Sequence, residues 1–451
     1  MMDSVRVFTK NFIKYFIYIT VFAQIVSGTV YLVCNFNEFI VYPETEEMVH
    51  AAKTLVFDEY IGFLYPLFIR VCLNIQNLCG VGYYLIVHGV QLAAMFFAVY
   101  YMIQPFFGRK KAWLVGTYVM SVPMCMQTAL MVSPFAFKAI FSFLIAGSMV
   151  RIWKDAKTIK GWIILLGIWA VSAFNVPDDL FVWGVPILGL SLMVIFRKSD
   201  KLHIGKRCCI FLAVLVVFLG AFGTVKGVTE PGSRGRMHKT VGSVLFQRTL
   251  WPDLGMKYGF LPLDIQVCFE PNTAFSSDRS AETITNMIGP KVEREYGVER
   301  ANDLFMVAFK NQLSYNKKTL SYAIVNDFSG YLLSPYMIIV YMQGIEGSAL
   351  GSLYNIISNN NPEIVYVYLN IFLVTLFVLT VLTVLQLIKS KEMLKRGKSK
   401  GAISIMGILV YQALWYAIVN IQGVDYRYVL LNVVIIAATI LGVSVKGYIR
   451  T

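Results

Sequence analysis

The sequence predicts an all-α integral membrane protein with about ten transmembrane helices. Three observations support this fold class: composition, the length of the hydrophobic runs and the distribution of charge. Apolar residues make up 57% of the chain, charged residues only 15%, and the mean hydropathy is +0.63. A soluble protein of 451 residues has no core large enough to bury so much apolar surface. Composition therefore excludes a chain built only of soluble domains.

Long uncharged runs are the second observation. Phe12–Val33, Val81–Ile103 and Val365–Ile388 carry almost no charge, and each reaches the roughly 20 residues that a helix needs to cross about 30 Å of hydrocarbon. The first run is too long for the core of a signal peptide, and no small-residue cleavage site follows it. We therefore expect a retained first span.

The expected spans follow from these runs and from proline positions. Residues 112–150 have basic flanks at both ends, so this stretch must cross an even number of times, and Ser133 with Pro134 favours a break into two short spans. The predicted spans are 12–35, 80–104, 112–130, 133–150, 161–176, 180–196, 208–227, 363–388, 402–420 and 428–446.

Charge distribution is the third observation. Of the 40 Lys and Arg residues, 23 fall in every second loop or at the termini, with only four acidic residues beside them. The remaining segments hold 17 basic and 22 acidic residues. This asymmetry is the positive-inside pattern, so we expect both termini in the cytoplasm of a multi-pass plasma (inner) membrane protein. The net charge of +14 then indicates a lipid bilayer as partner and not nucleic acid.

The first outer loop, residues 36–79, is expected to hold two interfacial helices. An apolar face recurs at helical spacing after Pro43, a residue that suits the first turn of a helix. The members of this face are Met48, Ala51, Ala52 and Leu55. The half-polar stretch Tyr60–Asn77 is too interrupted for a span, so it is expected to form the second interfacial helix.

Residues 228–362 form the second outer segment, which at about 135 residues is long enough for a small domain. Ala301–Leu313 shows one apolar helical face, and Val325–Val340 is expected to pack against the membrane helices. The chain is thus divided into an N-terminal transmembrane module at 1–227, a mostly helical extracytoplasmic domain at 228–362 and a C-terminal transmembrane module at 363–451.

Motifs of soluble enzymes are missing: the sequence has no GxGxxG after a strand, no P-loop, no HExxH and no GxSxG. Other elements carry a resemblance. They are Leu64–Arg70, Pro105 followed by Phe-Phe-Gly-Arg-Lys, Pro123, Ser133–Pro134 and the late Val424–Val429. In this order the chain resembles the GT-C superfamily of polyprenyl-phosphate-sugar-dependent glycosyltransferases, in the branch of protein mannosyltransferases and the aminoarabinose transferase. The resemblance covers about 12–150 and 402–446.

The resemblance implies transfer of a sugar from a polyprenyl-phosphate donor to a glycan, lipid or protein acceptor. A carboxylate at the outer interface would take the proton from the acceptor hydroxyl. The family's acidic residue corresponds best to Glu44, but this chain has Glu-Thr-Glu-Glu where the family has Asp, so Glu44, Glu46 and Glu47 all stay open. These three are alternatively ordinary charges at a helix start.

Further acidic residues are weaker candidates. Asp178 and Asp179 lie in an outer hairpin, where they would bind a divalent cation such as Mg or Mn, orient the acceptor, or cap the next helix. Asp58 and Glu59 are expected either to assist the first-loop carboxylates or to form a solvated turn.

Cationic groups must hold the departing phosphate. Arg427 is the first candidate, because it stands between two Tyr at an outer boundary, against the positive-inside trend. Its alternative is a contact with lipid headgroups, and Arg70 is a second candidate. The basic run of Arg234, Arg236, His238 and Lys239 contacts phosphate or forms a solvated flank.

Three rival functions remain. An O-antigen-type polymerase or ligase carries paired Arg and a His in one large outer loop, as Arg234, Arg236 and His238 do here, but the early acidic loop argues against it. A lipid or glycan transporter predicts charged or broken helices in corresponding positions of two halves, and the spans show little charge and no such symmetry. A non-catalytic assembly protein on the same fold is the third.

Overall fold

A computed structural model describes residues 2–37, 43–57, 62–154, 159–196, 204–229, 237–249, 261–268, 288–332, 362–389, 399–419 and 430–448. Within these ranges the protein is built from α-helices and contains no strand. The helices are α1 (Met2–Asn35), α2 (Pro43–Thr54), α3 (Leu64–Cys79), α4 (Tyr83–Met120), α5 (Pro123–Leu130), α6 (Pro134–Lys154), α7 (Ile159–Asn175), α8 (Asp179–Phe196), α9 (Ile204–Val228), α10 (Val241–Thr249), α11 (Leu263–Gln266), α13 (Gly289–Tyr296), α14 (Val298–Leu332), α17 (Pro362–Lys389), α18 (Ser399–Val419) and α19 (Leu430–Tyr448).

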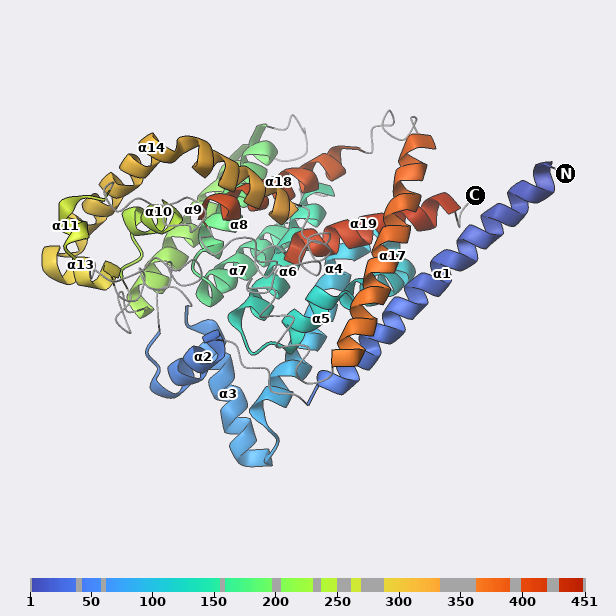
Figure 1. Ribbon diagram of the computed structural model, residues 1–451, viewed down its shortest axis with the longest axis horizontal. Coiled ribbons are helices and arrows are strands. Elements are labelled where there is room, and N and C mark those ends of the chain that lie inside the picture. The colour runs from blue at the N-terminus through green and yellow to red at the C-terminus, as the bar shows by residue number, and fades with distance from the viewer. Residues whose placement is uncertain are drawn as a thin grey trace.

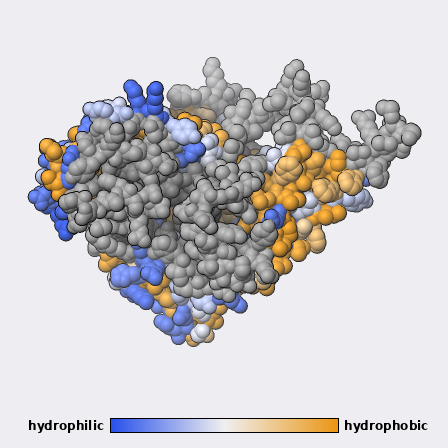
Figure 2. Space-filling view, viewed as in Figure 1, coloured by the Kyte–Doolittle hydropathy of each residue, from blue (hydrophilic) through white to orange (hydrophobic). Residues whose placement is uncertain are grey.

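Apolar helices make up most of this fold. Among the described residues, four helical stretches are long and apolar enough to cross a membrane, and these are Asn11–Asn35, Tyr83–Met120, Pro134–Trp153 and Cys208–Val228. Five shorter apolar stretches lie in α7, α8, α17, α18 and α19. In Figure 2 a hydrophobic surface covers α1 and α17, where Phe22 is 67% and Phe377 68% exposed. Such helices, with their backbone hydrogen bonds made internally, indicate a membrane-embedded protein.

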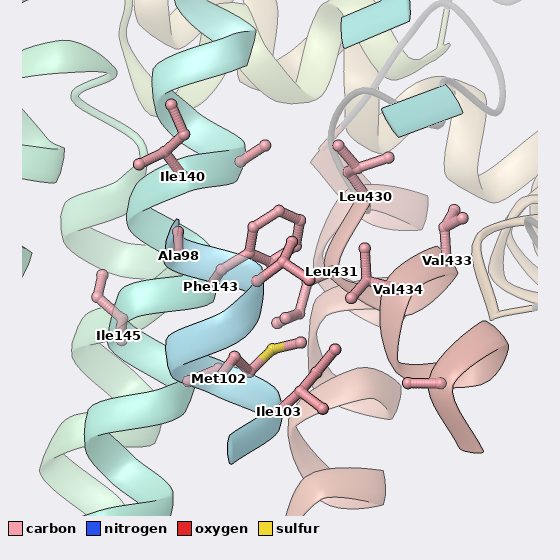
Figure 3. Packing of buried hydrophobic residues seen from close by; sticks show 14 of the residues in the cluster. Ala98, Met102, Ile103, Ile140, Phe143, Ile145, Leu430, Leu431, Val433 and Val434 are labelled. Carbon is pink, nitrogen blue, oxygen red and sulfur yellow. The ribbon is translucent and has the colours of Figure 1, made fainter. Parts of the chain in front are cut away.

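One part of the main core lies where α4, α6 and α19 meet. Figure 3 shows Ala98 and Met102 of α4, Phe143 of α6, and Leu431 and Val434 of α19 gathered in one cluster. Each of these side chains is at most 4% exposed. Residues from the C-terminal module therefore complete a core that the N-terminal module begins, although more than 280 positions separate Phe143 from Leu431.

Two predicted helix starts are confirmed, and the prediction that Leu55 belongs to the apolar face of the first-loop helix is wrong. The helices α2 and α6 begin at Pro43 and Pro134, as expected for a residue with a fixed φ and no N–H to lose. Leu55, however, lies beyond the end of α2 with a left-handed backbone (φ 61°) and is 45% exposed. Its position after the helix end takes it off the apolar face that Met48 and Ala52 bury.

The helix breaks at two places near the expected span 112–130, once just before it at Gly108 and once within it at residues 121–122. At Gly108 the backbone leaves the helical region (φ 73°), so α4 consists of two helical parts that meet there. The second part stops at Met120, and α5 begins at Pro123, whose ring disfavours helix at the preceding residue. All eight residues of α5 are buried. The chain therefore places a broken helix at the centre of its apolar body.

Neutral side chains bind the carbonyl oxygen that this break leaves at Ser121. The amide of Gln24 donates to the Ser121 oxygen at 2.7 Å, and the hydroxyl of Tyr368 donates to the same atom. The helix α1 comes close here, because a Cβ added at Gly28 would lie 2.9 Å from the Ser121 Cβ. A helix can be broken in an apolar body only where its freed backbone groups find such partners.

The other end of α5 is held in the same way by Gln91 of α4. Its amide nitrogen donates to the carbonyl oxygens of Ala129 and Met131, at 2.9 and 2.7 Å. Its amide oxygen accepts a hydrogen bond of 2.7 Å from the Tyr65 hydroxyl of α3. One buried amide therefore joins α3 and α4 to the end of α5.

A second, smaller apolar core lies within residues 237–308, over α10, α11, α13 and the first half of α14. The Phe246 and Phe305 rings stack at 4.9 Å, and the Gly242 N–H donates to the Asn302 side chain at 2.8 Å. The predicted apolar face of Ala301–Leu313 is confirmed at Leu304, Phe305 and Ala308, whereas Leu313 is 41% exposed. Farther along α14, Tyr331 packs against Tyr416 of α18 at 6.0 Å, as expected, whereas residues 333–340 lie outside the described residues.

Candidate functional site

The first loop and the α7–α8 hairpin meet at one end of the helical body. The Phe63 N–H donates to the Phe174 carbonyl oxygen at 3.0 Å, and the two rings stack at 5.1 Å. Gly62 makes this approach possible, because its φ is 71° and an added Cβ would lie 2.5 Å from the Phe174 oxygen. Figure 1 shows α2 and α3 together at this end of the molecule.

The acidic helix α2 is fixed at its N-terminus by a buried hydroxyl. Thr45 donates a hydrogen bond of 3.0 Å to the Val132 carbonyl oxygen, in the turn between α5 and α6. Along α2, Glu46 is exposed and Glu47 is half-buried. Glu44 lies in the first turn, but its side chain is outside the described side chains. Because residues three apart share a helix face, Glu44 and Glu47 lie on one flank of α2 and Glu46 on another.

Arg70 of α3 binds the other end of α2. Its guanidinium donates to the Ala52 carbonyl oxygen at 3.2 Å, in the last turn of that helix, where carbonyl groups lack helical partners. The sequence predicts Arg70 as a phosphate ligand. The contact with Ala52 occupies one of its hydrogen-bond donors, and the side chain is half-buried.

The α7–α8 hairpin carries a buried ion pair that the sequence reasoning missed. The Asp179 carboxylate lies 3.5 Å from the Lys138 ammonium of α6, and the two side chains are 0% and 2% exposed. Ser172 of α7 donates its hydroxyl to the same carboxylate. The available signal was Lys138 itself, a charge four residues after Pro134 within an apolar run.

Aromatic rings complete the surroundings of this pair. The Lys138 ammonium lies 4.9 Å from the centre of the Tyr416 ring of α18 and 6.0 Å from that of Phe135. The Trp169 indole N–H donates to the Asp179 carbonyl oxygen at 3.3 Å. Cation–π contacts of this kind add to the attraction of the carboxylate in stabilising a desolvated ammonium. The pair therefore joins α6, α7, α8 and α18.

Asp178, the neighbouring carboxylate, binds Lys239 at 2.5 Å. The two side chains are 31% and 20% exposed, so this second pair lies at the rim of the site. Burial on its own raises the pKa of Asp178, but the ammonium groups of Lys239 and Lys138 outweigh it and hold the pKa below its ordinary value. Lys239 is thus part of the site and ties the segment 237–249 to the hairpin.

Whether Asp178 and Asp179 bind a divalent cation stays a prediction, and each of these carboxylates contacts a lysine. The two ammonium groups would compete with a cation for the carboxylate oxygens. In the ranges that the structure describes, no group of three or more His, Cys, Asp or Glu side chains has a metal-binding arrangement.

His238, one of the residues on which the polymerase or ligase alternative depended, is held by Glu293 of α13. Its backbone N–H donates to both carboxylate oxygens at 2.8 and 3.0 Å, and its ring Nδ1 lies 2.9 Å from one of them. The Glu293 side chain is 7% exposed. These hydrogen bonds join the segment just before α10 to α13.

The remaining predicted site residues lie outside the described residues, and these are Asp58, Glu59, Arg234, Arg236 and Arg427. Comparison of the chain with family models, with curated proteins and with solved structures finds no match. The site is therefore interpreted from its own chemistry: a flank of acidic residues on α2 and a cluster of two carboxylates with two lysines, both at one end of an apolar helical body.

Proposed function

We propose that this protein is a membrane glycosyltransferase of the GT-C type. It would move a sugar from a polyprenyl-phosphate donor to a glycan, lipid or protein acceptor at the outer face of the membrane. The observation that most supports this proposal is the docking of α3 on the end of α7 through Phe63 and Phe174, because it brings the acidic flank of α2 to the same end as the charged hairpin.

The proposal includes a topology of about ten spans with both termini in the cytoplasm. The two parts of α4, the second continued by α5, contribute two of these spans. The others are α1, α6, α7, α8, α9, α17, α18 and α19. In this orientation α2, α3 and the extracytoplasmic domain at 228–362 face outward, as does the Asp178–Lys239 contact.

The proposed reaction is a single displacement that inverts the anomeric carbon. The acceptor hydroxyl attacks this carbon while a first-loop carboxylate takes the hydroxyl proton. The bond from the anomeric carbon to the phosphate oxygen breaks, and its electron pair leaves with the polyprenyl phosphate. We assign the base to the flank of Glu44 and Glu47, since Glu47 is half-buried against the body while Glu46 faces solvent. Arg427 remains the proposed phosphate ligand.

Single substitutions in α2 test the base. Purified protein in liposomes with polyprenyl-phosphate mannose or polyprenyl-phosphate aminoarabinose, and host membrane extract as acceptor, should release polyprenyl phosphate. Glu47→Gln or Glu44→Gln should lower this release by about 100-fold or more, the effect of losing a general base. Glu46→Gln and the exposed Glu299→Gln serve as matched controls. Full activity of both Glu44→Gln and Glu47→Gln would reject the base, and no release from either donor by the unmodified protein would count against the proposed reaction.

A transporter is the second candidate, and the Lys138–Asp179 pair is the observation that favours it. Charged residues inside a membrane body often mark substrate or proton pathways. A variant that removes both charges, Lys138→Met with Asp179→Leu, separates the two functions. Loss of lipid or glycan movement across liposomes by this folded variant, with donor cleavage absent in both proteins, would favour the transporter.

A further inference from the structure

An apolar groove of about 370 Å³ lies between α1, α4 and α19, away from the site described above. Its walls include Ile17, Val21 and Ile25 of α1, Leu114 of α4 and Leu441 of α19. Almost all of its surface is apolar, and the groove is open to the outside. In a membrane-embedded protein, a groove of this kind is complementary to a hydrocarbon chain and not to a polar solute.

The register between α1 and α4 gives the groove a direction. Gln24 of α1 contacts Ser121, and about two turns earlier on each helix Tyr18 and Leu114 both line the groove. Ser121 and Leu114 are about two helical turns apart, and so are Gln24 and Tyr18. The helix α1 and the second part of α4 therefore run parallel here, and residues one turn before Tyr18 and Leu114 lie at the same end of the groove.

Three lysines occupy that end. Lys14 lies one turn before Tyr18, and Lys110 and Lys111 lie one turn before Leu114, so each is on the helix face that continues the groove. Lys14 is half-buried, and the other two are exposed. The groove is thus apolar along its length and positively charged at one end.

Aromatic side chains place this charged end at a membrane–water interface. Tyr15 is 63%, Tyr18 43% and Trp113 54% exposed, and all three lie within one turn of the lysines. Exposed Tyr and Trp beside Lys are typical of the headgroup level of a bilayer. The lysines therefore stand at the depth of lipid phosphates, while the groove extends into the hydrocarbon.

We propose that this groove binds one anionic glycerophospholipid, with an acyl chain along the groove and the phosphate on Lys14, Lys110 and Lys111. Charge complementarity selects the headgroup, because an anionic lipid keeps its net negative charge whereas the choline of a zwitterionic lipid cancels it beside three ammonium groups. This inference does not depend on the proposed transferase activity, since α1, the second part of α4 and α19 line the groove and none of α2, α3, α7 and α8 does.

The full chain, purified in detergent, is titrated with dioleoyl phosphatidylglycerol and with dioleoyl phosphatidylcholine, and bound lipid is counted by native mass spectrometry. We expect phosphatidylglycerol to bind at least tenfold more tightly. Each lysine replaced by Ala should weaken it about fivefold, the factor that corresponds to about 1 kcal/mol per basic residue near a lipid surface. Replacing the exposed Lys53, Lys310 and Lys317 by Ala is the matched control and should change nothing.

A groove variant tests the acyl chain separately. Leu114 is 48% exposed, so Leu114→Trp should fold and fill the groove. The Leu114→Trp variant should bind both lipids more weakly. The lysine variants, in contrast, should keep their binding of phosphatidylcholine. Equal binding of the two lipids, or unchanged selectivity in the triple Lys14, Lys110 and Lys111 variant, would overturn the proposal. If a polyprenyl phosphate binds this groove tenfold more tightly than phosphatidylglycerol, the phospholipid proposal is overturned and the occupant is the lipid carrier of the proposed donor.

Discussion

The helical body buries polar groups in two regions, and it satisfies them in different ways. Around α5, the neutral amides of Gln24 and Gln91 donate to backbone oxygens that the broken helix leaves without helical partners. Around the α7–α8 hairpin, the opposite charges of Lys138 and Asp179 are buried together. Gln24 and Gln91 each bind carbonyl oxygens that are freed at a helix end or near a proline. The Lys138–Asp179 pair, in contrast, binds no carbonyl oxygen freed by the break at α5.

The amides around α5 have a structural role, whereas the ion pair at the hairpin is a candidate for function. A neutral hydrogen bond to a freed carbonyl costs little and permits a shape that an unbroken helix does not allow. Two buried charges carry a large desolvation cost, and well-packed apolar residues often replace such a pair without loss of stability. The buried Lys138–Asp179 pair therefore makes the hairpin a stronger candidate for a functional site than α5.

The largest effect is expected from removing one member of the ion pair. Asp179→Leu leaves the Lys138 ammonium buried without its counter-ion, so the free energy of unfolding should fall by about 3–5 kcal/mol. The double variant Lys138→Met with Asp179→Leu should recover most of this loss, because no charge then remains buried. Unfolding in mixed micelles of increasing denaturing detergent measures all three proteins. A single variant as stable as the unmodified protein would show that the pair is not formed.

A smaller effect is expected at α5. Gln91→Leu leaves the Ala129 and Met131 carbonyl oxygens and the Tyr65 hydroxyl without this partner, which should cost about 2–3 kcal/mol in the same measurement. The matched control is Gln76→Leu. Its amide oxygen accepts only the Tyr83 N–H at a half-buried helix start, and its loss should cost below about 1 kcal/mol. Equal losses in the two variants would contradict a special role of Gln91 in holding the break.

The smallest effect is expected at the rim, and it depends on pH. The pKa of Asp178 is lower in the folded protein than its ordinary value of about 3.9, so its contact with Lys239 stabilises the fold fully above that value. The contribution disappears as the pH falls through the lower, folded pKa. Asp178→Asn should therefore cost below about 1 kcal/mol at neutral pH and nothing in strong acid. The exposed Asp303→Asn is the control, and a cost that persists in acid would rule out the ionic contact.

Most helix positions could be predicted from the sequence, because the signals are local. Hydrophobic run length predicted the ends of most apolar helices within a few residues, and prolines marked the starts of α2 and α6. The break inside 112–130 was not predicted, although Pro123 was visible. A proline alone is compatible with either a kink or a full stop, and the stop at Met120 depends on partners from α1 and α17.

The candidate site was predicted only in part. Asp178 and Asp179 were selected because adjacent carboxylates at an outer turn are chemically conspicuous, and the structure gives each of them a lysine. Lys138 was overlooked because one charge in an apolar run carries no information about its partner. Lys239 was named only within a basic run, since the 61 positions between it and Asp178 hide the contact.

The sequence by itself determined that this chain is an apolar, helical membrane protein with clustered basic segments, because composition and hydropathy act on each segment independently of its neighbours. Only the tertiary structure decided which helix ends meet, which carbonyls Gln24 and Gln91 bind, and that Asp179 faces Lys138. These contacts depend on how helices pack against one another, and the energies that select them come from pairs of side chains far apart in the chain.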